Sequence, residues 1–125
     1  MKLRWMASFG MGLLAVGLLI PASAAQRLGQ WTTAAPMPGA RTEVAVAEIA
    51  GKVYVVGGRI DGSFARNLRV NEEYDPETDR WWKRAPMPTA RHGLGAVAIG
   101  GRIFVVSGGP RPGGSSSGLN EVFTP

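Results

Sequence analysis

Short apolar runs, divided by glycine pairs and polar turns, make up most of the chain after residue 40. Residues 44–49 and 52–56 are rich in Val and Ile and are separated by Ala50 and Gly51, which predicts a tight β-hairpin. Because these runs contain few polar residues, we expect both faces of the strands to be buried between stacked sheets. The same reasoning predicts later strands at 69–74, 81–83, 94–99, 102–106 and 119–123.

A block of sequence occurs twice, 50 positions apart. Trp31–Arg41 returns as Trp81–Arg91, and both copies contain the string Ala-Pro-Met-Pro. Aligned without gaps from Trp31 to Val56, 11 of 26 positions are identical. Repetition at this period is typical of propellers and solenoids, so we expect two structural units of one kind.

The first 24 residues have the layout of a secretory signal peptide. Two basic residues precede an apolar run at 6–20, and Ala22–Ala24 supplies small residues at a cleavage point. The run is shorter than the roughly 20 residues that a membrane-crossing helix needs. We therefore expect cleavage after Ala24 or Ala25 and a secreted or periplasmic protein; an uncleaved membrane anchor is the alternative.

The amino-acid composition limits the kinds of catalysis and binding that the chain can support. The chain has no cysteine, which excludes thiol catalysis and cysteine-ligated metals, and its single histidine offers no set of metal ligands, so no cofactor is expected. Its net charge of +5 is reduced once the two basic residues of the signal peptide are removed. Both signs are interspersed without a run of Lys or Arg, so no nucleic-acid partner is expected.

Several segments resemble the kelch repeat. They are Ala40-Arg41 before the first expected strand, Gly51–Gly58 across the second, Glu73–Asp79 after the third, and Trp81 followed by Ala85–Pro88. The resemblance implies an all-β fold of kelch-type β-propeller blades: two four-stranded antiparallel blades in an incomplete ring, after a helical signal peptide. It also implies structural roles, between blades or in crowded turns, for Trp31, Gly57, Gly58, Tyr74, Trp81, Gly108 and Gly109.

The expected blades occupy residues 25–125. Their strands fall at about 41–83 and 91–125, and residues 28–33 form a lone fourth strand that matches the one missing from the second blade. Two blades do not close a ring, because each sheet buries both faces against neighbours. Three explanations stay open: a longer propeller, self-assembly such as three chains making six blades, or a fragment that does not fold alone.

Five residues are candidates for ligand binding. Arg41 and Arg91 occupy equivalent positions before a first strand, which in kelch propellers faces the mouth of the central channel, and arginine binds acidic groups bidentately. The alternative is that each arginine caps local carbonyls or pairs with a neighbouring acid. His92 and Glu43 are expected at the same mouth, and Arg59 lies in a loop of the kind that often carries function.

The resulting functional expectation is an exported binding or scaffold module, which recognises protein or carbohydrate through loops at the channel mouth. No catalytic residues are assigned. The sequence lacks the cysteine and histidines that kelch-type copper oxidases need. A resemblance to periplasmic sialic acid mutarotases, in which Arg91, His92 and Glu43 would act, leaves a sugar isomerase as one alternative. A truncated fragment without activity of its own is the other.

Overall fold

The computed structural model describes residues 29–60 and 66–125. The expected signal peptide and its cleavage point lie outside these residues. The contacts divide the chain into two units, Met1–Thr32 and Thr33–Pro125, and every strand belongs to the second unit. Among the residues that are described, no helix has the length and apolar character to cross a membrane.

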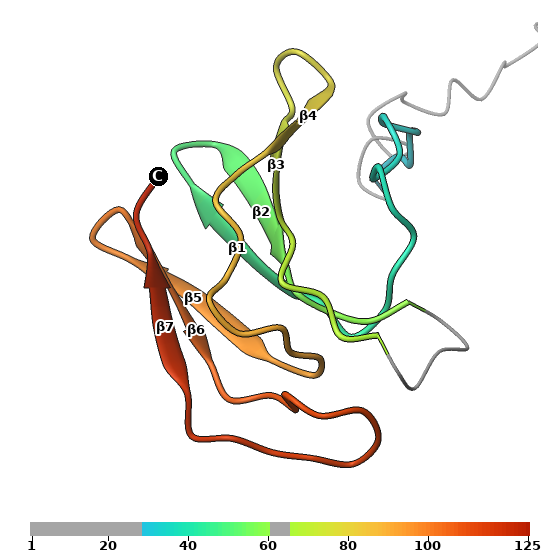
Figure 1. Cartoon of the computed structure of the whole chain (residues 1–125). Helices are drawn as coiled ribbons and strands as arrows, with labels where there is room; N and C mark the ends of the chain where they lie inside the picture. The colour runs from blue at the N-terminus through green and yellow to red at the C-terminus, as the bar shows by residue number, and fades with distance from the viewer. Residues whose placement is uncertain (1–28, 61–65) are drawn as a thin grey trace, which may run out of the picture. The chain divides into compact units, whose positions relative to one another are not determined.

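The first sheet, called blade 1 below, is a four-stranded antiparallel meander. Its strands lie side by side in the order of the sequence, in the green-to-yellow part of Figure 1. Tight glycine-containing and acidic turns connect strands one to two and three to four, as the turn residues predict. The strands are β1 (Ala45–Ile49), β2 (Lys52–Val56), β3 (Asn71–Asp75) and β4 (Arg80–Lys83).

The second sheet, blade 2, repeats this plan with three strands, drawn orange to red in Figure 1. They are β5 (Gly95–Ile99), β6 (Arg102–Val106) and β7 (Asn120–Phe123). The predicted all-β fold is confirmed. The lone strand expected at 28–33 is wrong for residues 29–33, which form no strand. A strand exists only where a neighbour accepts and donates its backbone hydrogen bonds, and no described strand pairs with this segment.

The core lies between the two blades. Ala45, Ala47, Tyr54 and Val56 on one face of blade 1 pack against Ile103 and Val105 on one face of blade 2. The expectation that both faces of every strand are buried is wrong, because side chains alternate in direction along a strand and only one face of each blade meets the other. On the opposite faces Val46 is 53% and Val97 48% exposed.

The aromatic contact between the blades differs from the expected one. Tyr54 and Phe123 join the blades, with ring centroids 5.8 Å apart. Tyr74 and Trp81 instead stack on each other at 5.1 Å, on the face of blade 1 that points away from blade 2. Tyr74 pairs with Val53, the neighbour of Tyr54, so the alternation of the strand turns the two tyrosines to opposite faces.

Gly57 lies at the crowded point where the blades approach each other. A Cβ at this position would come within 2.8 Å of Met87 and 2.9 Å of both the Arg91 carbonyl oxygen and Leu94. Its φ of +65° also favours glycine. Gly58, Gly108 and Gly109 are similarly confined: a Cβ there would lie 2.6–2.8 Å from Thr42 or His92 atoms.

A polar network lies beside this core. Arg84 donates two hydrogen bonds to the buried carboxylate of Glu73, at 2.8 and 2.9 Å, and this pairing lowers the pKa of Glu73. Burial, together with a hydrogen bond to Glu73, raises the pKa of Tyr54 to about 12. The Tyr54 hydroxyl is therefore held neutral at the centre of the blade interface.

Tyr54 predicts a loss of stability at high pH. Its pKa is raised from 10.0 in the unfolded chain to about 12 in the folded one, so its contribution is fully present below pH 10. As the pH rises from 10 to 12 the free energy of unfolding should fall by roughly 2–3 kcal/mol through this group. Urea unfolding of the wild type and Tyr54→Phe across this range measures the difference. Parallel pH dependences of the two proteins would contradict the assignment.

Candidate functional site

Arg41 clamps the start of β1 to the next two strands. Its Nε donates to the Gly57 carbonyl oxygen at 3.1 Å, and its Nη2 donates to that of Val55 at 3.1 Å. Its Nη1 forms an ion pair with Glu72 of β3 at 2.6 Å. The two side chains are 2% and 5% exposed, so the guanidinium is fully engaged inside blade 1.

Arg91 makes the same clamp in blade 2. It donates to the Ser107 carbonyl oxygen at 2.6 Å and to that of Val105 at 3.4 Å, and it pairs with Glu121 of β7 at 2.9 Å. Its side chain has no exposed surface, and its Nε has no partner among the described residues. Both arginines therefore cap strand-end carbonyls and pair with an acid, which is the alternative given for them from the sequence.

The residues directly after the arginines do come together. Glu43 pairs with Arg59, and the His92 Nε2 lies 3.9 Å from the Glu43 Oε2. The His92 Nδ1 lies 2.8 Å from the Asn67 Oδ1. We call Glu43, Arg59, Asn67 and His92 the Glu43 cluster. It draws on the start of β1, the loop between β2 and β3, and the segment that leads into β5.

Backbone bonds fix this arrangement where the two blades meet. The Thr42 amide donates to the Arg59 carbonyl oxygen at 2.9 Å, and the Gly93 amide donates to that of Glu43 at 3.0 Å. The His92 amide donates to the Gly109 carbonyl oxygen at 3.2 Å. These bonds tie the entrance of each first strand to the glycine loop that leaves the second strand, so the cluster is held by both blades.

Glu43 occupies a backbone conformation that normally belongs to glycine. Its φ is +56°, and its equivalent in blade 2 is Gly93, with a φ of +62°. A left-handed conformation costs a residue with a Cβ roughly 1–2 kcal/mol. Strained residues of this kind often serve function. Blade 1 therefore keeps a carboxylate at a position where blade 2 uses glycine.

The hydrogen bonds of the cluster fix the orientation of the histidine ring. The Asn67 amide group donates to the Gly109 carbonyl oxygen at 3.0 Å, so its Oδ1 is left to face the His92 Nδ1. The His92 Nε2 then faces the Glu43 carboxylate. The arrangement offers imidazole, carboxylate, guanidinium and amide groups to a polar ligand. Asn67 was not singled out from the sequence, because nothing in its loop marks it before the fold brings it to His92.

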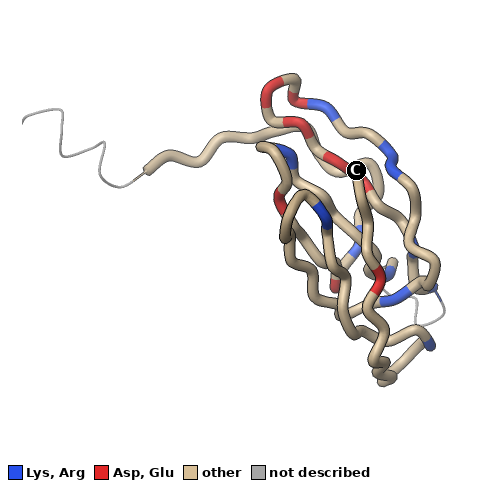
Figure 2. Tube along the Cα trace, turned by 90° about the vertical axis from the view of Figure 1, so that its left-hand side faces the viewer, with Lys and Arg blue, Asp and Glu red and all other residues tan. Residues whose placement is uncertain are grey.

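The cluster is partly open to solvent. The Glu43 side chain is 34% exposed and that of Arg59 is 25% exposed, while that of His92 is 9% exposed. No group of three or more metal-binding side chains occurs among the residues that the structure describes. Charged positions of both signs lie along the trace, and the β3–β4 turn gathers acidic residues away from the cluster (Figure 2).

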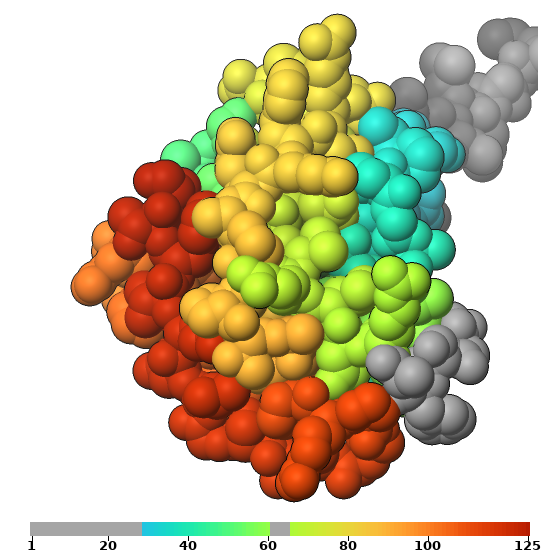
Figure 3. Space-filling model, viewed as in Figure 1, coloured from blue at the N-terminus to red at the C-terminus, as the bar shows by residue number. Residues whose placement is uncertain are grey.

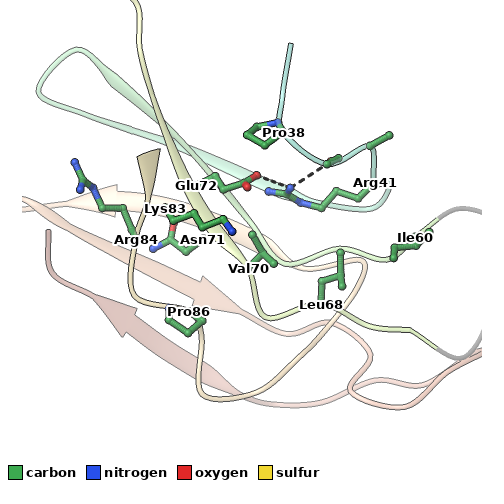
Figure 4. Close-up of a pocket in the computed structure, with 12 residues that line it drawn as sticks. Pro38, Arg41, Ile60, Leu68, Val70, Asn71, Glu72, Lys83, Arg84 and Pro86 are labelled. Carbon is green, nitrogen blue, oxygen red and sulfur yellow. Dashed lines mark hydrogen bonds and ion pairs between the residues drawn. The ribbon is translucent and has the colours of Figure 1, made fainter. Parts of the chain in front are cut away.

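A hollow of about 450 Å³ lies behind the Arg41–Glu72 ion pair. Its wall is largely apolar, from Leu68 and Val70 on one side and prolines on the others, with Lys83 and Arg84 also along it (Figure 4). Ile60, the residue after Arg59, reaches one end of it. An apolar hollow thus begins next to the Glu43 cluster.

Removing the Arg91 clamp should destabilise the protein strongly. Arg91→Ala leaves Glu121 and two strand carbonyls without their charged partner, which should lower the free energy of unfolding by about 3–5 kcal/mol. Arg91→Lys should recover little, because one ammonium does not reproduce the planar fork. Urea unfolding followed by tryptophan fluorescence measures both, with the exposed Arg111→Ala as control. An Arg91→Ala protein as stable as that control would contradict the clamp.

Comparison with known proteins agrees with this architecture. Residues 40–88 match the family model of the kelch motif. The chain is 28% identical to the solved structure of YjhT, with a TM-score of 0.59 over 66% of this chain and 25% of that chain. It therefore spans a quarter of the length of YjhT, a kelch-type propeller protein. No curated protein matches the chain. The chain therefore carries a kelch motif at residues 40–88, and its two sheets resemble the blades of a kelch-type propeller.

Proposed function

We propose that this chain is a kelch-type binding module, which recognises a carbohydrate or protein ligand through the loop end that carries the Glu43 cluster. The observation that carries the proposal is the convergence of Glu43, Arg59, Asn67 and His92 from three separate segments of two blades. These side chains supply hydrogen-bond donors and acceptors, and they include a negatively charged carboxylate and a positively charged guanidinium. Such a set suits hydroxyl groups or the polar groups of a peptide.

Two features of the surroundings support this choice. Glu43 keeps a strained backbone conformation at a position where the second repeat has Gly93. This supports a use for its carboxylate beyond folding. The apolar hollow that starts at Ile60 offers a place for the less polar part of a ligand. Arg41 and Arg91 have no place in this proposal, since both guanidinium groups are used inside the blades.

A sugar isomerase is the second candidate, because one observation favours it. The His92 Nε2 and the Glu43 carboxylate are 3.9 Å apart, so both can contact one sugar ring. One group would accept the proton of the anomeric hydroxyl while the other donates a proton to the ring oxygen as the ring C–O bond breaks, and the reverse transfers would close the ring to the other anomer. Arg91 drops out of this scheme. Addition of the protein to freshly dissolved N-acetylneuraminic acid, followed by NMR, tests it. Anomer interconversion no faster than in buffer would rule this candidate out while leaving the binding proposal in place.

Removing the Glu43 carboxylate should weaken ligand binding without unfolding the protein. Glu43→Gly introduces the residue that blade 2 carries at this position, so relief of strain should offset the lost ion pair to within about 1 kcal/mol. On a glycan microarray and an immobilised peptide library, probes bound by the wild type should lose at least about tenfold in affinity with Glu43→Gly and Asn67→Ala.

Glu77→Gln is the matched control, because Glu77 is exposed in the β3–β4 turn at the other end of blade 1. It should bind like the wild type. Wild-type protein that retains no probe from either collection would contradict the proposed function, as would Glu43→Gly binding as tightly as Glu77→Gln.

We also propose that the protein is exported, on the strength of the signal-peptide layout of residues 1–24. Expressed with its own N-terminus in a bacterial host, the protein should be recovered from the periplasm or medium with residue 25 or 26 as its first residue. N-terminal sequencing checks this. Protein that keeps Met1 and stays in the cytoplasm would show that the segment does not act as a signal.

A further inference from the structure

Blade 2 leaves an apolar sheet face open. On the side away from blade 1, Val97 and Val122 are each 48% exposed and Ile99 is 60% exposed. Surface from β5 and β7 forms the left edge of the space-filling view (Figure 3). We call this surface the open face of blade 2. It consists of Gly95, Val97, Ile99, Arg102, Phe104, Val106 and Val122, which alternate with the core-facing residues of their strands.

The open face of blade 2 repeats the face of blade 1 that already receives a neighbour. Fifty residues earlier, its positions in β5 and β6 correspond to Ala45, Ala47, Ile49, Lys52, Tyr54 and Val56. All of these except Lys52 belong to the core between the blades or pack against it. The same sheet geometry therefore occurs twice in the molecule, once covered and once uncovered.

The face of blade 1 that points away from blade 2 corresponds to the side of the internal interface that blade 2 supplies. We call it the outer face of blade 1; it includes Val46, Glu48, Val53, Val55 and Tyr74. The equivalent residues of blade 2 are Ala96, Ala98, Ile103, Val105 and Phe123, which form the side of the core that blade 2 supplies. Val46 is 53% exposed on this outer face. Each half of the internal interface thus has a counterpart on the outside of the chain.

We propose that a second copy of this chain docks head to tail, with the open face of blade 2 in one copy packed on the outer face of blade 1 in the next. The internal interface is the template. Tyr54 meets Phe123 inside the chain at 5.8 Å. The equivalent pair between two copies is Phe104 with Tyr74, and Val97 takes the place of Ala47 beside β1 of the neighbour.

Charge complementarity favours a second copy as the occupant. In blade 1, Lys52 pairs with Asp75 at 2.7 Å, but the position equivalent to Asp75 in blade 2 is Thr124. Arg102, the counterpart of Lys52, has no ion pair with any residue that the structure describes, and its guanidinium lies 5.3 Å from the Phe104 ring. On the outer face of blade 1, Glu48 replaces the Ala98 of the internal interface. Head-to-tail docking places Arg102 and Glu48, which are opposite in charge, on the two facing surfaces at their hairpin ends; Glu48 also accepts a hydrogen bond from the Gly51 amide at 2.6 Å.

Because the two docked surfaces differ, the contact is heterologous, and it forms a ring where the rotation from one copy to the next closes. Propellers usually hold roughly four to eight blades, which corresponds to two, three or four copies where each copy contributes blades 1 and 2.

Light scattering during size-exclusion chromatography tests the proposal over a wide range of protein concentration. We expect a discrete species of two to four chains for the wild type, and single chains for Val97→Asp and Arg102→Glu. The double variant Arg102→Glu/Glu48→Arg restores the ion pair in reverse and should recover the assembly. Thr78→Asp places a new charge in the exposed β3–β4 turn and should assemble like the wild type.

Circular dichroism of every variant separates loss of assembly from loss of folding. Because Val97 and Arg102 are exposed in the single chain, both variants should keep the β-sheet spectrum of the wild type. A folded wild type that stays a single chain at all concentrations would overturn the proposal. An assembly that withstands Val97→Asp would overturn it equally, and failure of the charge swap would overturn the Arg102–Glu48 contact.

Discussion

The buried arginine clamp holds each blade of this protein together. Arg41 and Arg91 each reach from the entrance of a first strand to the carbonyls at the end of the second strand and to a glutamate of the third. A guanidinium suits this task because its planar donors satisfy several acceptors in fixed directions. Burying such a charge is costly unless it is paired, so the glutamate and the arginine are needed together.

The clamp also determines where the Glu43 cluster forms. Since each arginine fixes the chain at the mouth of the blade, the next residues are delivered to a defined position beside the glycine loop. In blade 2 this brings His92 against Asn67, and in blade 1 it brings Glu43 against Arg59. The repeat diverges at this point, with glutamate in one blade and glycine in the other at the same positive φ. The candidate site therefore depends on the backbone geometry that both blades share and on the glutamate that blade 1 carries where blade 2 has glycine.

Because side chains alternate in direction along each strand, the two faces of a blade have different surroundings. One side of each blade enters the shared core, and the other side leaves valine and isoleucine in contact with solvent. The apolar surface is therefore paired once inside the chain and repeated unpaired outside it. Surfaces of this kind favour association with a complementary sheet, and the complementary sheet is present in every copy of the chain.

The sequence by itself determined the local structure. Val-rich runs, glycine pairs and the Asp-Pro turn placed the seven strands to within two residues, and the repeat identified the blades. Local signals suffice there because hairpins and tight turns form between neighbours in sequence. Only the tertiary structure decided what meets across longer distances. It turned Tyr54 rather than Tyr74 toward blade 2, buried the two arginines on glutamates about 30 residues away, and brought Asn67 to His92. Alternation specifies that a strand has two faces, but the packing of whole sheets decides which face is covered and which partner a charged side chain finds.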